Sequence, residues 1–196
     1  MKYNIQGIPT YYDSIRFRSR LEAKWAMLFN DFGWEWEYEP IDLNGWIPDF
    51  ILTGQKGTEI LVEVKPYARL EKFEEVIKKI ERATRSTNFK NTEVLLLGRK
   101  LLEAESWSHQ DKKPLAIGWL GEVFTEDKAK KYDYGKAVLN NSCGFGFIHD
   151  YNSYKDRITE LHDGDHYVCF PDIERVRKMW KNVGNKVQWE ATYETH

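Results

Sequence analysis

The chain has 196 residues, of which 41% are hydrophobic and 15% aromatic, and its formal net charge is −2. This composition excludes a disordered chain, and no apolar run reaches the ~18–20 residues that a membrane span needs. The first residues lack the hydrophobic segment of a secretory signal, and two cysteines are too few for a disulfide framework. We therefore expect one cytoplasmic domain over residues 1–196, with no membrane partner.

Charged residues are unevenly spread along the chain. Residues 31–65 carry eight acidic and two basic side chains, whereas residues 66–100 carry nine basic and five acidic ones. An acidic centre between basic flanks suits a metal site that meets a polyanion, although an ordinary solvated surface produces the same pattern.

The first predicted element is a helix over residues 19–32. Its apolar residues recur at helical spacing and form one stripe. They are Leu21, Trp25, Leu28, Phe29 and Phe32. Ser19 is suited to the N-cap of this helix, and Gly33 is suited to its C-terminal end.

Strands follow this helix. Residues 34–40 alternate in polarity and predict one strand, and residues 47–53 and 58–65 flank a glycine turn and predict a hairpin. A second amphipathic helix is predicted over residues 69–86, and a buried strand over residues 92–98.

The order of helix, three strands, helix and strand predicts an α/β fold with a central mixed β-sheet flanked by helices, over a core of about residues 15–100. Signals are weaker beyond this core. The expected elements there are a polar loop at 103–113, strands around 117–124 and 145–149, and a helix over 172–183. We interpret residues 101–196 as an α+β elaboration of the same domain.

The predicted hairpin carries charges where its strands should be buried. Side chains alternate between the two faces of a strand, so Glu63 and Lys65 share the face opposite to Val64. Asp49 precedes the turn near Gln55 and Glu63 follows it, so the two carboxylates should be near-opposite or diagonal neighbours. Such a pair repels unless a proton or a cation lies between them, and oxygen ligands favour Mg²⁺ or Mn²⁺. An exposed pair of Glu63 and Lys65 on the surface is the alternative.

The full pattern is Pro48-Asp49 on one strand and Glu63-x-Lys65 on the next. It resembles the signature of the PD-(D/E)xK nuclease superfamily, and the predicted order of elements is similar to the core of that family. The resemblance implies a restriction-endonuclease-like core over roughly residues 15–100, in which one or two Mg²⁺ ions support the hydrolysis of phosphodiesters. It also implies that Asp49 and Glu63 hold the metal, while Lys65 positions or deprotonates the attacking water or stabilises the transition state.

A further match lies upstream. Residues 17–29, together with the Tyr-Glu-Pro at 38–40, resemble an N-terminal block of phage-encoded and transposon-end-cleaving branches of the superfamily. In such branches a helix glutamate completes the metal site, and Glu22 is the matching position, acting on the metal directly or through a water. The alternative is a capping box, in which Glu22 reaches back to the start of the helix at Ser19. Glu39 is a weaker candidate that could help to bind a second ion, and the alternative is a surface glutamate at the end of a strand.

Basic residues near these positions are candidates for contacts with the phosphates of DNA. The first group comprises Arg16, Arg18, Arg20 and Lys24. The second group lies on the basic face of the helix predicted over residues 69–86 and comprises Lys78, Lys79, Arg82 and Arg85. An ordinary solvated helix face explains the second group equally well.

Other patterns carry less weight. Five residues are of the types that bind zinc: Cys143, His149, His162, His166 and Cys169. Their spacing matches no compact zinc finger. No glycine-rich phosphate loop is present, so we expect no nucleotide cofactor. Trp107 lies in the polar loop, where it either stacks on a base or anchors the loop.

Together these features predict a Mg²⁺-dependent endonuclease that acts on DNA. A homodimer or a partner protein would supply the second site that paired cuts in a duplex need. Three alternatives stay open. One is a nucleic-acid-binding module of the same fold that is catalytically silent or depends on a partner, and another is a structure-selective or RNA-cleaving nuclease. The third is a zinc-bearing interaction protein with a structural role.

Overall fold

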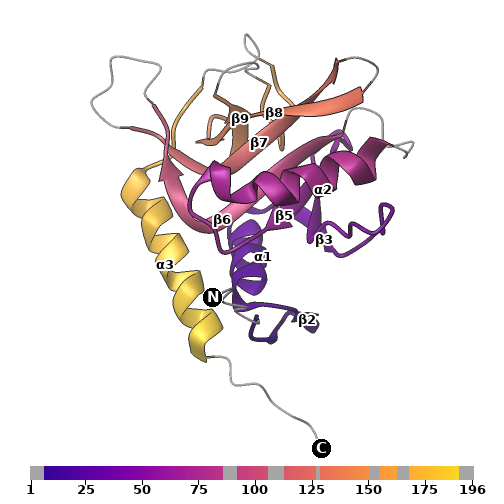
Figure 1. Ribbon diagram of the computed structural model, residues 1–196. Coiled ribbons are helices and arrows are strands. Elements are labelled where there is room, and N and C mark those ends of the chain that lie inside the picture. Colours follow the sequence, from indigo (N-terminus) through magenta and orange to yellow (C-terminus); the bar gives the residue numbers. More distant parts are fainter. Residues whose placement is uncertain are drawn as a thin grey trace, which may run out of the picture.

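A mixed seven-stranded sheet forms the centre of the chain in the computed structural model, which describes residues 7–85, 92–105, 113–126, 129–150, 155–162 and 168–189 (Figure 1). The strands of this sheet neighbour one another in chain order. They are β3 (Glu35–Tyr38), β4 (Phe50–Thr53), β5 (Glu59–Val64), β6 (Glu93–Glu103), β7 (Leu115–Glu126), β8 (Ala129–Asn140) and β9 (Gly146–His149). Neighbouring strands run antiparallel except β5 and β6, which are parallel.

The other elements surround this sheet. They are the small hairpin of β1 (Thr10–Tyr12) and β2 (Ile15–Phe17), the helices α1 (Arg20–Phe32), α2 (Glu74–Arg85) and α3 (Ile173–Trp189), and the 3₁₀ helix η1 (Leu70–Phe73). The parallel pairing of β5 with β6 needs a crossover connection, which η1 and α2 provide. None of the helices in the described part of the chain is both long enough and apolar enough to cross a membrane.

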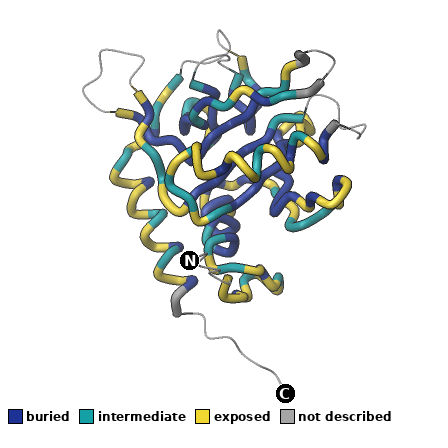
Figure 2. Tube along the Cα trace, in the orientation of Figure 1, coloured by how far each residue is buried: buried dark blue, intermediate teal, exposed yellow. Residues whose placement is uncertain are grey.

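Helices cover both faces of the sheet (Figure 1). On one face, Trp25 of α1 and Val183 of α3 share a core cluster with Val62 of β5. On the other face, Ile80 of α2 shares a cluster with Leu61 of β5. Consecutive residues of β5 therefore enter opposite clusters, as the alternation of a strand requires. The strands between these layers are largely buried (Figure 2), so polar side chains on them need partners.

The β4–β5 hairpin sets the position of the predicted carboxylates. Its register pairs Phe50 with Val62 and Thr53 with Glu59. Extending this register by one residue beyond β4 brings Asp49 opposite Glu63, at the carboxyl end of β5. The hairpin therefore carries both acids to one edge of the sheet.

The predicted α/β class with a mixed sheet flanked by helices is confirmed, and α1 lies between the expected N-cap Ser19 and C-cap Gly33. Several expectations are incomplete. β8 and the β1–β2 hairpin were not predicted, β6 continues past residue 98, and α3 continues past residue 183. Residues 106–112 of the expected polar loop, including Trp107, lie outside the described residues.

Candidate functional site

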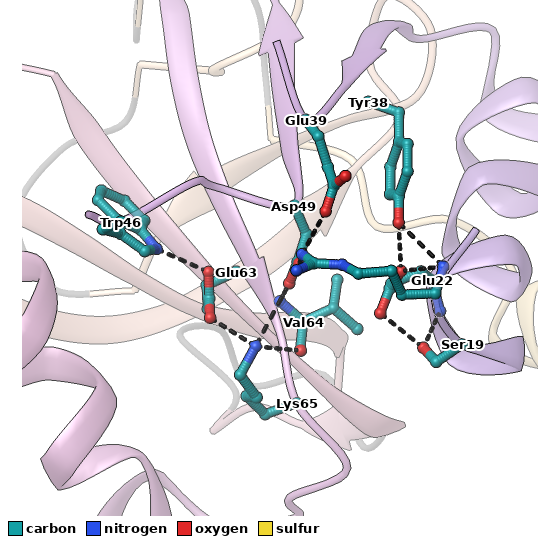
Figure 3. A network of polar contacts seen from close by, with 10 residues as sticks. Ser19, Glu22, Tyr38, Glu39, Trp46, Asp49, Glu63, Val64 and Lys65 are labelled. Carbon is teal, nitrogen blue, oxygen red and sulfur yellow. Dashed lines mark hydrogen bonds and ion pairs between the residues drawn. The ribbon is translucent and has the colours of Figure 1, made fainter. Parts of the chain in front are cut away.

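Three oxygen atoms converge on the ammonium group of Lys65, directly after β5 (Figure 3). The Lys65 Nζ atom lies 2.5 Å from Oε1 of Glu63 and 3.5 Å from Oδ2 of Asp49. It also donates a hydrogen bond of 3.0 Å to the backbone carbonyl of Val64. Carboxylate and carbonyl oxygens are the ligands that hard divalent cations prefer. The hairpin therefore builds an oxygen set around one cation position, and Lys65 fills it.

The backbone of the hairpin holds Asp49 in this place. Oδ2 of Asp49 accepts a hydrogen bond of 2.7 Å from the backbone N–H of Val64, and the residue is only 1% exposed. Pro48 fixes its own φ and disfavours a helical backbone at the preceding Ile47, which suits the entry into β4. The carboxylate thus links the start of β4 to the end of β5, which fixes the distance between Asp49 and Glu63.

Trp46 fixes the second carboxylate. Its indole Nε1 donates a hydrogen bond of 2.8 Å to Oε2 of Glu63, and both side chains are buried. Reciprocal backbone hydrogen bonds join Leu43 to Trp46 across a tight turn, in which Asn44 and Gly45 have positive φ angles. With Oε2 taken by the indole, Glu63 directs Oε1 at Lys65. No pattern in the sequence predicts this contact, because Trp46 lies in a loop rather than in a periodic element.

Arg18 is the second cation of the site. Its Nη2 lies 2.8 Å from Oδ1 of Asp49 and 2.5 Å from Oε1 of Glu39. Asp49 therefore contacts Arg18 through one oxygen and Lys65 through the other. Arg18 was predicted to contact phosphates, and its side chain is still 57% exposed, so the guanidinium remains open to a ligand.

Glu22 adopts the geometry of a helix cap. Its backbone N–H donates to the Ser19 hydroxyl, which in turn donates to Oε1 of Glu22 at 2.7 Å. Oε2 of Glu22 accepts hydrogen bonds from the backbone N–H of Arg18 and from the hydroxyl of Tyr38, at 3.0 and 2.7 Å. Both carboxylate oxygens are thus engaged at the start of α1, beside the Lys65 cluster (Figure 3).

Burial and the paired charges shift the titration of this cluster. Burial raises the pKa of Asp49 to about 7, and Glu63 adds to this rise, while Lys65 and the Val64 amide oppose it. Burial alone would lower the pKa of Lys65, but the carboxylates of Asp49 and Glu63 raise it above its ordinary value. Lys65 is therefore a charged ammonium at neutral pH in this arrangement.

Two clefts open onto the cluster. One, of about 330 Å³, lies between the 44–47 loop and the start of α2. It is lined by Arg18, Gly45, Ile47, Glu63, Lys65, Glu75, Val76 and Lys79. The other, of about 400 Å³, lies between the N-terminal segment, the start of α1 and the end of β5. It is lined by Gly7, Ile8, Arg18, Ser19, Arg20, Leu21, Glu22, Val64, Lys65 and Pro66. Arg18 and Lys65 belong to both, so the two clefts meet at these two cations, which contact the carboxylates of Asp49 and Glu63.

The other predicted basic residues are placed differently. Arg20 lines the larger cleft, and Arg16 is exposed on β2. Lys24 lies against α3 instead, with its ammonium 3.4 Å from the ring centroid of Trp180, and burial lowers the pKa of Lys24 to about 8. No described contact joins Lys24 to the carboxylate cluster.

The basic face of α2 is only partly near the site. Lys79 lines the smaller cleft, whereas Lys78 forms ion pairs with Glu74 and Glu75 on its own helix. Arg82 is exposed, and the side chain of Arg85 lies outside the described residues.

The side chains of the types that bind zinc are scattered over the described part of the chain. Within the described ranges, no three His, Cys, Asp or Glu side chains converge as a group that could hold a metal ion. Cys143 and Cys169 are free and exposed, and His166 lies outside the described residues. The oxygen set at Lys65 consists instead of two carboxylates and one backbone carbonyl.

Comparisons of the chain with protein-family models, with curated proteins and with solved structures found no match. Any function of this chain therefore has to be inferred from the residues and geometry of the site itself.

Proposed function

We propose that this protein is a metal-dependent nuclease that hydrolyses DNA phosphodiester bonds within a strand and uses Mg²⁺ or Mn²⁺. One observation carries the proposal. Asp49 Oδ2, Glu63 Oε1 and the Val64 carbonyl surround a single cation position, which opens onto clefts lined by Arg18 and Lys65. Paired hard oxygen ligands next to cations that can hold a phosphate form the arrangement that phosphoryl hydrolysis needs.

Each residue has a role in this proposal. Asp49, Glu63 and the Val64 carbonyl would hold the metal ion, which would lower the pKa of a bound water and neutralise charge on the phosphate. Lys65, once displaced from the three oxygens, would face the cleft and either hold a phosphate oxygen or position the attacking water. Glu22, with both oxygens engaged, would reach the ion only through a water.

Cations around the clefts would bind the backbone of the substrate. Arg18 and Arg20 line the larger cleft, and Arg18 and Lys79 line the smaller one. Each can contact phosphates without reading sequence. Arg16, exposed on β2, would extend this surface, whereas the contact of Lys24 with α3 argues against a direct phosphate contact.

The order of the elements supports the finer fold assignment within the same proposal. Helix α1, the antiparallel β3–β4–β5 unit, the α2 crossover and the parallel strand β6 follow in the order that the PD-(D/E)xK resemblance implies. We therefore extend the proposal to a restriction-endonuclease-like core formed by these elements, on which β7 to β9 and α3 are an elaboration.

The test is cleavage by the purified protein of supercoiled, linear and single-stranded DNA and of RNA, each with EDTA, Mg²⁺ or Mn²⁺. We expect nicks or internal cuts in DNA that need the metal ion and disappear in Glu63→Gln. The matched control is Glu59→Gln, an exposed glutamate on the same strand, which should cleave like the wild type. Cleavage in EDTA, or an active Glu63→Gln variant, would refute the site. Cleavage of RNA alone would support the assignment of the site but would mean that its substrate is RNA rather than DNA.

A second candidate function is a DNA-binding module that is catalytically silent or needs a partner. The observation in its favour is that Arg18 contacts Oδ1 of Asp49 while Lys65 and the Val64 amide contact Oδ2. This carboxylate is therefore fully engaged by groups of the chain itself. Tight DNA binding in EDTA without cleavage in any metal lane would favour this candidate.

A further inference from the structure

Two exposed isoleucines stand beside the candidate site, one in each cleft. Ile8 is 51% exposed and lines the larger cleft, and Ile47 is 40% exposed and lines the smaller one. Single exposed hydrophobic residues are common on protein surfaces and usually need no explanation. These two differ because both clefts meet at Arg18 and Lys65, so the isoleucines flank the oxygen set from two sides.

Contacts with neighbouring residues hold the backbone in place at both isoleucines. The buried Thr10 donates its hydroxyl to the carbonyl of Ile8 at 3.1 Å. Next to Ile8, Gly7 packs so closely against Arg18 that a Cβ there would lie 2.7 Å from the Arg18 carbonyl oxygen. The exposure of Ile8 therefore belongs to an anchored segment.

Ile47 is anchored in a similar way. It lies between Pro48 and the buried Trp46, whose backbone forms two hydrogen bonds with Leu43, of 2.7 and 3.1 Å. The same Trp46 side chain bonds to Glu63. Ile47 is thus held at a fixed place relative to the carboxylates.

Each cleft combines this apolar group with positive charge. The larger cleft has Arg20 beside Ile8, and the smaller one has Lys79 beside Ile47. A cation next to an aliphatic side chain matches the chemistry of one nucleotide, which has a charged phosphate and an apolar base face. The volumes of the two clefts, about 330 and 400 Å³, lie within the range of pockets that bind small molecules.

The paired duplex hides the surfaces that these isoleucines could contact. Its bases are stacked on one another, and its outer surface presents phosphates and sugars. An isoleucine side chain can enter between the base steps of a duplex, but only by partly unstacking them, which costs a few kcal/mol per step and which unpaired bases avoid in part. In addition, Asp49 is 1% exposed and lies behind Arg18 and Lys65 rather than in the lining of either cleft, so a strand must come close to reach it.

On the basis of the proposed nuclease function, we infer that the site acts on DNA whose bases are unpaired next to the scissile phosphate. Ile8 and Ile47 contact the unstacked bases on the two sides of that phosphate, while Arg20 and Lys79 hold the neighbouring phosphates. Arg18 and Lys65 hold the phosphate between them.

The experiment compares a paired DNA duplex with the same duplex carrying a central bubble of unpaired bases. Binding is measured by fluorescence anisotropy in EDTA, where no cleavage occurs, and cleavage is measured separately with Mg²⁺. The variant is Ile8→Ser with Ile47→Ser, and each single substitution is measured as well. The control is Phe124→Ser on β7, which removes a hydrophobic side chain of similar exposure, 43%, from a residue that lines neither cleft.

We expect the wild type to bind the bubble at least about tenfold more tightly than the duplex, which is the gain from covering one or two isoleucines. The double variant should lose this preference and bind the duplex like the wild type, and Phe124→Ser should keep the preference. Equal affinity of the wild type for bubble and duplex, a preference that survives in the double variant, or no binding of either DNA would overturn the inference.

The same experiment separates this inference from the proposed nuclease function. Selective binding of the bubble without cleavage in Mg²⁺ would keep the recognition of unpaired DNA and refute the nuclease. Equal cleavage of bubble and duplex would keep the nuclease and overturn the inference. A 2-aminopurine base at the edge of the bubble adds a direct readout, since its fluorescence should change on binding to the wild type and much less with the double variant.

Discussion

Asp49 gives the protein a specific dependence of stability on pH. Burial and the nearby Glu63 raise the pKa of Asp49 to about 7 in the folded state, from an ordinary value of 3.8. Between these two values the folded state binds a proton that the unfolded state has released. The free energy of unfolding should therefore fall as pH rises from about 4 to about 7, and this contribution should be constant above that range. Asp49→Asn, which cannot ionise, should lack it.

The size of the effect follows from the shift in pKa. One unit corresponds to about 1.4 kcal/mol, and integration between about pH 4.5 and about pH 7.5 gives a loss of about 3 kcal/mol for this group. Lys65 and Arg18 do not change the slope, because the pKa of each is raised and both stay protonated over this range in the folded and unfolded states. The difference between the wild type and Asp49→Asn therefore isolates the carboxyl group.

Urea unfolding of both proteins at several values of pH, without metal, measures this difference. The wild type should lose about 3 kcal/mol more than Asp49→Asn between the two ends of the range. Asp31→Asn, which changes an exposed aspartate of α1, serves as the control and should follow the wild type. Parallel stability curves for the wild type and Asp49→Asn would refute the reasoning, because they would mean that Asp49 is charged at little cost when buried.

Three further predictions concern single side chains. Trp46→Phe removes the indole donor to the buried Glu63 and should lower cleavage about tenfold and the free energy of unfolding by about 1–3 kcal/mol, whereas Trp36→Phe should cleave normally. Glu22→Gln leaves one acceptor oxygen for three donors and should lower the free energy of unfolding by about 1 kcal/mol, with a smaller loss of Mn²⁺ affinity in calorimetry than Glu63→Gln causes. Burial lowers the pKa of Lys24 to about 8, so the wild type should gain stability as pH rises from 8 towards 10 and Lys24→Met should not, as thermal melts at both ends can check.

The sequence was most informative where local and tertiary signals agree. The α1 helix has an apolar stripe, a capping serine and a glycine stop, and Ser19 and Gly33 are its caps in the structure. The β4–β5 hairpin has a clear glycine turn and apolar runs, which fix its register. Because strand alternation is strict, that register predicts that Asp49, Glu63 and Lys65 meet, and the structure brings them together.

Helices and strands that depend on contacts with distant parts of the chain were not fully predicted. Gly184 suggests the end of a helix, yet α3 continues through it, and a Cβ at this position would lie 3.0 Å from the ammonium of Lys24. β8 begins with charged residues that hide its strand character, although it pairs with β7 over most of its length. Long antiparallel pairing of this kind is decided by the partner strand rather than by local propensity.

Within the site, contacts from loops could not be predicted. The hydrogen bond of Trp46 to Glu63 and the contacts of Arg18 with Asp49 and Glu39 join segments far apart in sequence, and no periodicity connects them. The expected role of Arg18 in phosphate binding was based on charge alone. Its contact with a buried carboxylate depends on the path of the chain between β2 and α1.

The ammonium of Lys65 occupies the position at which the sequence predicts a metal ion. Two buried carboxylates need a cation between them, and the ammonium of Lys65 meets this need in the chain itself. A divalent ion must therefore displace Lys65, so its binding competes with an ion pair that is already formed. Removal of the ammonium in Lys65→Met should leave the carboxylates uncompensated, and the variant should bind Mn²⁺ more tightly than the wild type although it no longer cleaves DNA.

Calorimetry with Mn²⁺ and thermal melts with and without Mg²⁺ test this competition. The melting temperature of Lys65→Met should rise more on addition of Mg²⁺ than that of the wild type, because binding to the folded state alone stabilises it in proportion to affinity. Lys72→Met, which removes an exposed lysine of η1, should respond like the wild type. If Lys65→Met binds Mn²⁺ no better than the wild type, the ammonium and the metal ion do not share one position, and the oxygen set at Lys65 is only a structural ion pair.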